Sequence, residues 1–345
     1  MEGLVARFEG DTLPLYWGGN DDDDSGVVQY VSLRYGGHVV SIANELNGMS
    51  LGGVGRGTDM EYIEIMNNVD DGIEIWGGTL NIKHVSIWNI GDDSFDLDQG
   101  YRGKAQFGLI VQGYCGENSQ GSGIGDNCME MDGAEDAAAQ PYGAPSIYNF
   151  TVIGQPLDGD QGTEWRDNMR AQFGNCVFMD VGGTMVKDGG DGGDGGGYGS
   201  AGVPTLAELF STAYDAYPSN TASVHPASLY PNFSSGNWCQ FADTVFYNLA
   251  ETDSLTTFGI LDAGNNVVAE ASPIQEIVRA DPVLVGDKVM SLVTSLNPRA
   301  AGDAVASEGM APDDGFFTPV AYKGAFGDDN WLLGWTAAAA YGMTN

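Results

Sequence analysis

Short segments of alternating apolar and polar residues recur along the chain, and most of them end on Asn, Asp or Gly. They begin at residues 30, 62, 84, 108, 149, 175 and 243 and read YVSLRY, YIEIMN, HVSIWN, GLIVQG, NFTVIG, NCVFMD and DTVFYN. A period of two predicts β-strands, because helices repeat every 3.6 residues. The starts at 62, 84 and 108 lie 22 and 24 residues apart, too close for a βαβ crossover of about 30 residues or more. Each segment therefore predicts one turn of a parallel β-solenoid, and longer spacings mark loops inserted into single turns.

In a solenoid, equivalent strands stack about 4.8 Å apart and alternate side chains point inward. We expect the inward residues to be Ile63, Ile65, Val85, Ile87, Cys176, Phe178, Thr244 and Phe246, and the outward residues to include Ser32, Glu64, Ser86 and Thr151. The last position of the segments holds Asn67, Asn89, Asp180 and Asn248, or Gly113 and Gly154. These residue types tolerate the left-handed backbone of a tight bend. A β-sandwich can use the same strands, but the matched register of the repeats favours the solenoid.

The repeats divide the chain into solenoid turns over 1–183, an insertion over 184–237, and final turns with a C-terminal cap over 238–345. A Gly/Asp-rich stretch from Lys187 to Gly199 opens the insertion, and its irregular spacing favours a loop over a calcium-binding repeat. The stretch from 204 to 217 predicts a short amphipathic helix with Pro in its first turn. The aromatic tail, 316–335, cannot be wholly exposed, so we expect it to cover the open end of the solenoid.

The net charge of the chain narrows the classes of molecule that we expect it to bind. The 345 residues include 48 acidic and 13 basic side chains, a formal net charge of −35 at pH 7. Phosphate binding requires Lys and Arg, so we expect neither nucleic acid nor anionic membrane as a partner. No run of 18 apolar residues occurs, which predicts no membrane insertion by this chain. Its first residues, MEGLVARFEGD, lack the basic and apolar regions of a signal peptide.

The four cysteines are Cys115, Cys128, Cys176 and Cys239, and none is in a CxxC pair of the zinc-site type. An even number of cysteines in an acidic, Lys-poor chain predicts two disulfides in an oxidising compartment. Cys115–Cys128 is then the local pair. Four buried thiols are the alternative.

Three stretches of the chain, 47–108, 146–154 and 313–335, resemble bacterial secreted or surface proteins made of right-handed parallel β-helix, pectin-lyase-like repeats. The first contains DMEYIEIMNNVDDGIEIWGG and the second reads SIYNFTVIG. Together with the repeat, the resemblance predicts an all-β, right-handed parallel β-helix with loop insertions, one short helix and an aromatic C-terminal cap. It also implies an extracellular or cell-surface location, with the signal or anchor outside this chain. It assigns no catalytic residues.

Carboxylates recur at the turns of the predicted solenoid. Asp70–Asp71 and Asp92–Asp93 hold equivalent positions, 22 residues apart, just after the turn Asn. Stacking would bring these four side chains together, where like charges are costly unless a cation neutralises them or their pKa values rise. Ca²⁺ takes oxygen ligands, commonly from Asp, so we predict calcium sites formed by these residues. An acidic bend whose Asp side chains cap local amides is the alternative. Further carboxylates cluster at 21–24 and at Asp126, Glu130 and Asp132.

The same region offers residues for catalysis. Asp96 and Asp98 alternate along a strand and therefore share a face, which with Asp93 indicates a paired-carboxylate glycoside hydrolase. The resemblance implies a second chemistry, because polysaccharide lyases of this fold use Ca²⁺ with an Arg or Lys base. Arg102 and Lys104 are the candidates for that base. Charge pairing with the neighbouring acidic cluster is the alternative role of both.

Aromatic residues in the early turns suggest a surface that stacks on sugar rings. Trp76, Trp88 and Tyr101 are the candidate glycan-binding residues, with burial under loops or the tail as the alternative. We therefore expect an extracellular, calcium-supported β-helix with a structural, adhesive or glycan-interacting role. Polysaccharide, other surface proteins or further copies of the chain are the expected partners. The competing function is a polysaccharide lyase or glycoside hydrolase that works in a groove along the β-helix.

Overall fold

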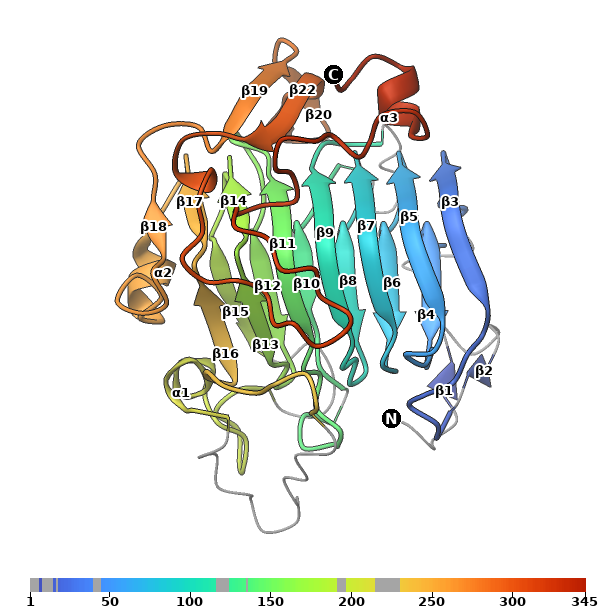
Figure 1. The fold of residues 1–345 in the computed structure, drawn as a ribbon, viewed down its shortest axis with the longest axis vertical. Helices are drawn as coiled ribbons and strands as arrows, with labels where there is room; N and C mark the ends of the chain where they lie inside the picture. The colour runs from blue at the N-terminus through green and yellow to red at the C-terminus, as the bar shows by residue number, and fades with distance from the viewer. Residues whose placement is uncertain are drawn as a thin grey trace.

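Two parallel β-sheets run the length of the molecule in the computed structural model, which describes residues 18–39, 45–115, 124–134, 136–190, 197–214 and 230–345 and the backbone of 6–7 and 15–16 (Figure 1). The long-strand sheet comprises β3 (Val27–Arg34), β5 (Asp59–Met66), β7 (Asn81–Trp88), β9 (Lys104–Val111), β11 (Ser146–Ile153), β13 (Ala171–Gly174), β14 (Val177–Met179), β16 (Cys239–Ala242), β17 (Val245–Tyr247) and β18 (Val267–Val268). The short-strand sheet comprises β4 (Met49–Gly52), β6 (Ile73–Trp76), β8 (Phe95–Asp98), β10 (Met129–Met131), β12 (Thr163–Arg166) and β15 (Val186–Gly190).

From β3 to β12 the chain alternates between the two sheets, and each coil adds one strand to each of them. Strands β5, β7 and β9 are paired in parallel with matched registers, Ile63 opposite Val85 and Val85 opposite Gly108. Strands β6 and β8 are paired in the same way in the other sheet. This is the predicted parallel β-helix, and the spacing of the repeats was its signal.

The space between the sheets is the main hydrophobic core. It contains Ile63, Ile65, Val85, Ile87, Cys176, Phe178 and Phe246, as the alternation predicted. Thr244 is also fully buried, one residue before Val245, which lies opposite Val177. Period-two alternation therefore identified the inward side of the long strands correctly.

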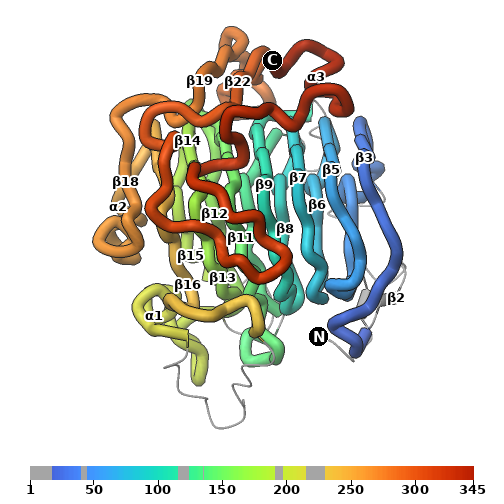
Figure 2. The backbone as a smooth tube through the Cα atoms, viewed as in Figure 1, coloured from blue at the N-terminus to red at the C-terminus, as the bar shows by residue number. Residues whose placement is uncertain are grey.

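A second core lies on the outer face of the long-strand sheet. There Met66, Trp88, Val111, Ile153 and Met179 pack against residues of the C-terminal region, including Phe326, Leu332 and Ala338. The segment 301–345, which we call the C-terminal strap, crosses this face, and Figure 2 shows it in red in front of β9, β11 and β14. The prediction of a cap over the open end is therefore wrong. The strap covers a side of the β-helix because the outward positions there are apolar.

The C-terminal region begins with two antiparallel pairs, β19 (Ile274–Arg279) with β22 (Val293–Ala300) and β20 (Val283–Val285) with β21 (Lys288–Met290). The strap then holds η1 (Gly302–Ala304) and α3 (Ala337–Ala340). Because the strap covers the outer face of the long-strand sheet, the predicted outward residues Glu64, Ser86 and Thr151 are buried.

The predicted bends are present at the ends of the long strands. Asn67, Asn89, Asp180 and Asn248 have φ values of 56°, 52°, 57° and 50°. Gly113 and Gly154 lie outside this left-handed set. A second left-handed position bends each long strand near its middle, and it was not predicted from the sequence. Its residues are Tyr30, Tyr62, His84, Phe107, Asn149, Asn175 and Asp243.

The predicted insertion contains both a strand and a helix. Strand β15 belongs to the short-strand sheet, so the β-helix continues to Gly190, and residues 191–196 of the Gly/Asp-rich stretch lie outside the described residues. Helix α1 (Leu206–Ser211) begins at Thr205, which forms a capping box with Glu208. A further short helix, α2 (Asp253–Thr257), precedes β18, and the two-stranded sheet of β1 (Ala6–Arg7) and β2 (Leu15–Tyr16) precedes β3. None of the helices in the described ranges is long and apolar enough to cross a membrane.

The predicted disulfides are wrong in this structure. Cys128, Cys176 and Cys239 are free thiols and are buried. The local Cys115–Cys128 bridge is therefore not formed. Burial raises the pKa of the Cys176 and Cys239 thiols to about 12, so both remain protonated. Cys176 and Cys239 lie in the main core and act as small apolar side chains.

Candidate functional site

Carboxylates stand in register along the outer face of the short-strand sheet. Glu74 is opposite Asp96, Asp96 is opposite Glu130, and Glu130 is opposite Glu164. We call these four residues the acidic ladder. Their strand neighbours Ile75, Leu97 and Met131 point into the main core, so alternation turns the carboxylates outward. Because adjacent strands are about 4.8 Å apart, the ladder places like charges close together on four successive coils.

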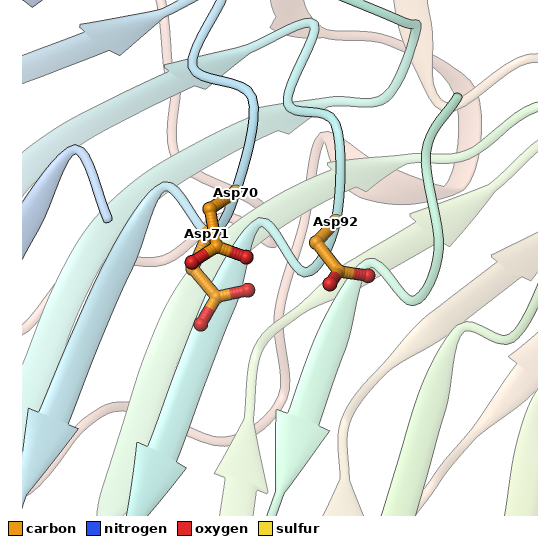
Figure 3. A group of neighbouring side chains, drawn as sticks. All are labelled: Asp70, Asp71 and Asp92. Carbon is orange, nitrogen blue, oxygen red and sulfur yellow. The ribbon is translucent and has the colours of Figure 1, made fainter. Parts of the chain in front are cut away.

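A second set of carboxylates lies in the turns that lead into these strands. Asp70 and Asp71 precede β6, Asp92 and Asp93 precede β8, and Asp126 precedes β10. Figure 3 shows Asp70 and Asp71 on one coil and Asp92 on the next. Carboxylate oxygens of these three residues, one from each, lie within 4.8 Å of one another. Asp92, Asp93 and Asp126 form a second such group. The four predicted metal ligands thus belong to two neighbouring groups rather than one.

Some of these turn carboxylates also hold the backbone of the next coil. Asp71 Oδ1 accepts a hydrogen bond from the Asp93 amide at 3.0 Å, and Asp93 Oδ1 accepts one from the Asn127 amide at 2.7 Å. Asp71 and Asp93 therefore each use one oxygen to cap a backbone amide, as the alternative predicted.

The ladder and the turns meet at Asp71, Glu74 and Asp96, all three buried. Oxygens from these residues lie within 4.8 Å of one another. Asp96 Oδ1 is buried and has no hydrogen-bond partner among the described residues. A carboxylate oxygen in that state is unfavourable unless it is protonated or bound to a cation. Glu74 was not predicted in this group, because the repeat of paired Asp residues marked the turns and not the second position of the short strands.

Burial governs the protonation of the site. It raises the pKa values of Asp71, Asp93 and Asp96 well above their usual range, and the neighbouring carboxylates raise them further. Burial also raises the pKa of Glu130 to about 8, although Arg166 opposes this shift, and that of Asp126 to about 6. Without a cation, these shifts favour the protonated forms of the carboxyl groups.

Cationic side chains accompany the other end of the ladder. Arg166 Nη2 lies 2.6 Å from Glu130 and 2.7 Å from Asp132, and Lys187 Nζ lies 3.0 Å from Glu164. Glu164, Arg166 and Lys187 were not predicted as site residues. The signal for Glu164 and Lys187 was the polar second position of their strands, and that for Arg166 was the fourth position of β12, but strands of four or five residues are too short to establish such a pattern.

The candidate catalytic residues divide between two places. Asp96 and Asp98 share the outer face of β8, as predicted, since Leu97 between them is in the main core. Arg102 is buried and its Nη2 lies 3.2 Å from Asp21, whereas Lys104 pairs with Asp314. With Arg56, Asn81 and Asn232, these two cations line a pocket of about 40 Å³. Both cations are charge-paired, but with Asp21 and Asp314 from distant parts of the chain and not with the neighbouring acidic cluster that was predicted.

The predicted glycan-binding aromatics are buried, which contradicts that assignment. Trp76 is 4% exposed, and Trp88 and Tyr101 are fully covered. Trp88 does point out of the β-helix, as alternation predicted, but the strap covers it in the second core. The Tyr101 hydroxyl donates a hydrogen bond to the Leu80 carbonyl inside the main core.

Comparison with known proteins supports the fold. The family model described as the pectate-lyase like beta helix domain matches residues 8–193, more than half of the chain. No curated protein and no solved structure matches the chain. The matched residues contain the predicted metal ligands and all four residues of the acidic ladder. This match and the parallel coils show that the chain belongs to the pectate-lyase-like β-helix family.

Proposed function

We propose that this chain is an extracellular β-helix protein that binds Ca²⁺ at the acidic ladder and uses the bound cation to contact polysaccharide. One observation carries the proposal: Asp71, Glu74 and Asp96 converge in a buried position, and Asp96 Oδ1 has no hydrogen-bond donor there. Like charges at this spacing favour either protonation or a cation. A cation satisfies all three residues together.

The donor set favours Ca²⁺ over softer metals. All the converging ligands are carboxylate oxygens, which suit hard cations, whereas Zn²⁺ and Cu²⁺ prefer imidazole or thiolate. Backbone carbonyls at the same turns can complete the six to eight oxygens that Ca²⁺ takes. A bound cation also offers a way for a chain of charge −35 to approach an acidic polysaccharide.

Calorimetric titration of the chelator-treated protein with Ca²⁺ tests the proposal. We expect heat of binding and a rise in melting temperature, both weakened at least about tenfold in Asp96→Asn, which keeps the shape and removes the charge. Asp303→Asn is the matched control, because Asp303 is exposed and lies in the strap. Absence of both heat and thermal stabilisation in the unaltered protein would refute calcium binding.

A second candidate function is cleavage of polysaccharide on the same face. The observation that favours it is the carboxyl pair Glu130 and Asp132, held by the partly exposed Arg166. Such a pair can divide the acid and base roles of glycoside hydrolysis. Incubation with neutral and uronate polysaccharides, followed by assays for reducing ends and for unsaturated product, distinguishes hydrolase, lyase and binding protein. Turnover that Glu130→Gln abolishes and Asp303→Asn preserves would support the enzyme.

A further inference from the structure

Aromatic rings form a continuous column on the outside of the long-strand sheet. Tyr30, Tyr62, His84 and Phe107 occupy the same mid-strand left-handed position of four successive coils. The ring centroids of Tyr30 and Tyr62 are 4.5 Å apart, those of Tyr62 and His84 are 4.4 Å apart, and those of His84 and Phe107 are 5.1 Å apart. The first two pairs are parallel within 5° and 1°, so the rings lie flat on one another along the axis of the β-helix.

Two indoles of the strap stand at right angles to this column. The Trp335 centroid is 5.8 Å from both Tyr30 and Tyr62, with interplanar angles of 86° and 85°. Since both faces of the Tyr62 ring are occupied by Tyr30 and His84, the Tyr62 edge must point at the face of Trp335. Trp331 has the same relation to His84, at 5.3 Å and 73°. The indoles therefore form a surface that runs along the column.

The column ends at an open ring face. Tyr30 lies on β3, the last strand of the long-strand sheet on this side, and its phenol is 60% exposed. One face of that ring is stacked on Tyr62, and no ring of the described residues covers the other. Trp335 stands beside it and is itself partly exposed. Among the residues that the structure describes, Tyr30 and Trp335 thus make an aromatic corner with one free face that continues the column.

Polar groups surround the aromatic corner. Gln29 and Glu61 immediately precede the first two rings of the column and are opposite each other in register. Gln29 Nε2 donates to Asp59 at 2.9 Å, which leaves its carbonyl oxygen available. The amide and carboxylate groups can hydrogen-bond hydroxyls on a ring that is stacked on Tyr30. Although Lys83 lies opposite Glu61, the net charge of −35 disfavours an anionic ligand.

We infer that the aromatic corner of Tyr30 and Trp335 is a binding site for neutral pyranose units of a polysaccharide. A pyranose presents an apolar face to the open face of Tyr30, and its hydroxyls reach Gln29 and Glu61. Neutral sugar fits better than a second copy of the chain, because two molecules of charge −35 repel each other. This site is separate from the acidic ladder and needs no cation.

Calorimetry with cellohexaose and mannohexaose, two neutral hexasaccharides, tests the inference, with hexagalacturonate as the anionic comparison. The titrations are done in chelator, so failure of calcium binding does not affect them. We expect binding of at least one neutral hexasaccharide and not of hexagalacturonate. Tyr30→Ala and Trp335→Ala should each weaken that binding about tenfold through loss of ring contact.

Tyr35→Ala is the matched control, because Tyr35 is 67% exposed at the end of the same strand but makes no ring contact with the column. Circular dichroism checks the fold, and Trp335→Phe replaces Trp335→Ala if the latter unfolds. The inference is overturned if neither neutral hexasaccharide binds, or if Tyr35→Ala weakens binding as much as Tyr30→Ala. Sedimentation velocity that shows dimers abolished by Tyr30→Ala would also overturn it, in favour of a second copy as the occupant.

Discussion

The aromatic column places ordinary residues in a backbone conformation that they usually avoid. A left-handed non-glycine residue costs about 1–2 kcal/mol. A stacked aromatic pair returns about 0.5–1.5 kcal/mol beyond its burial, so each ring in the column offsets much of its own strain. Beyond Phe107 the position changes to Asn149, Asn175 and Asp243. These side chains tolerate the left-handed conformation without a stacking partner.

His84 makes the column sensitive to acid. Burial, together with the positive charge of Lys83, lowers the pKa of its imidazole to about 4. The unfolded chain gains this proton near pH 6.5, whereas the folded chain gains it only near pH 4, so folded stability falls as pH decreases through this window. We predict that His84→Phe removes this loss, with a difference from the unaltered protein of about 2 kcal/mol at pH 4 after allowance for solvent screening.

Denaturant titrations of both proteins at pH 7 and pH 4 measure that difference. Phe is compatible with the site because Phe107 already adopts a φ of 61° at the equivalent position. The comparison between the two proteins is needed because many carboxylates also titrate in this range. An equal pH dependence in both proteins would show that His84 does not stay neutral in the fold.

At the scale of elements, one buried carboxylate fastens the strap to the β-helix. Glu64 on β5 is fully buried, and its two oxygens accept hydrogen bonds from the Ala337 and Ala338 amides at 2.7 and 3.0 Å. These amides open helix α3, where negative charge is favourable. Ser32 on the neighbouring strand also donates to Glu64. The carboxylate therefore joins α3 to two strands of the long-strand sheet.

Glu64→Gln should loosen the strap and leave the β-helix intact. The amide nitrogen would face a backbone N–H instead of accepting from it, a loss of about 2–3 kcal/mol for a buried charged hydrogen bond. Hydrogen exchange measured by mass spectrometry should show faster exchange over 325–345 and unchanged exchange in β7 and β9. Glu61→Gln, on the same strand but partly exposed, should change neither. Uniformly faster exchange would mean that the strap is required for the whole fold.

The sequence allowed the long strands and their inward faces to be predicted, because six or more alternating residues define a period of two. Trp88 shows the limit of that signal. Alternation indicates that it points outward, but it does not reveal that a segment more than two hundred residues later covers it. The location of the strap depends on this long-range packing.

The candidate site was predictable only in part for a related reason. Asp70, Asp71, Asp92 and Asp93 were visible because paired Asp residues recur at the repeat spacing. Glu74 and Glu164 lie in strands of four residues, which are too short for an alternation of apolar and polar residues to be distinguished from chance. Tyr30 was visible as an aromatic residue, but its open face depends on β3 being the last strand of its sheet.

At the scale of the whole molecule, a part of the negative charge is buried or half-buried, where it is costly. Burial raises the pKa of Glu130 from 4.5 to about 8 and that of Asp126 from 3.8 to about 6. In the absence of a cation, the unfolded chain loses these protons at lower pH than the folded chain does. The unfolded state thus binds fewer protons across this range, and folded stability decreases as pH rises from about 4.5 to about 8.

We therefore predict that the melting temperature in chelator falls by several degrees between pH 5 and pH 8, and that millimolar Ca²⁺ abolishes most of this fall. A cation bound to the ionised carboxylates replaces the protons, so its stabilising effect should grow as pH rises. Scanning calorimetry at constant ionic strength measures both curves, with Mg²⁺ as the control for general screening of the net charge. Equal stabilisation by Ca²⁺ at pH 5 and pH 8 would contradict this linkage, because a cation that does not compete with protons is not bound to the raised carboxyl groups.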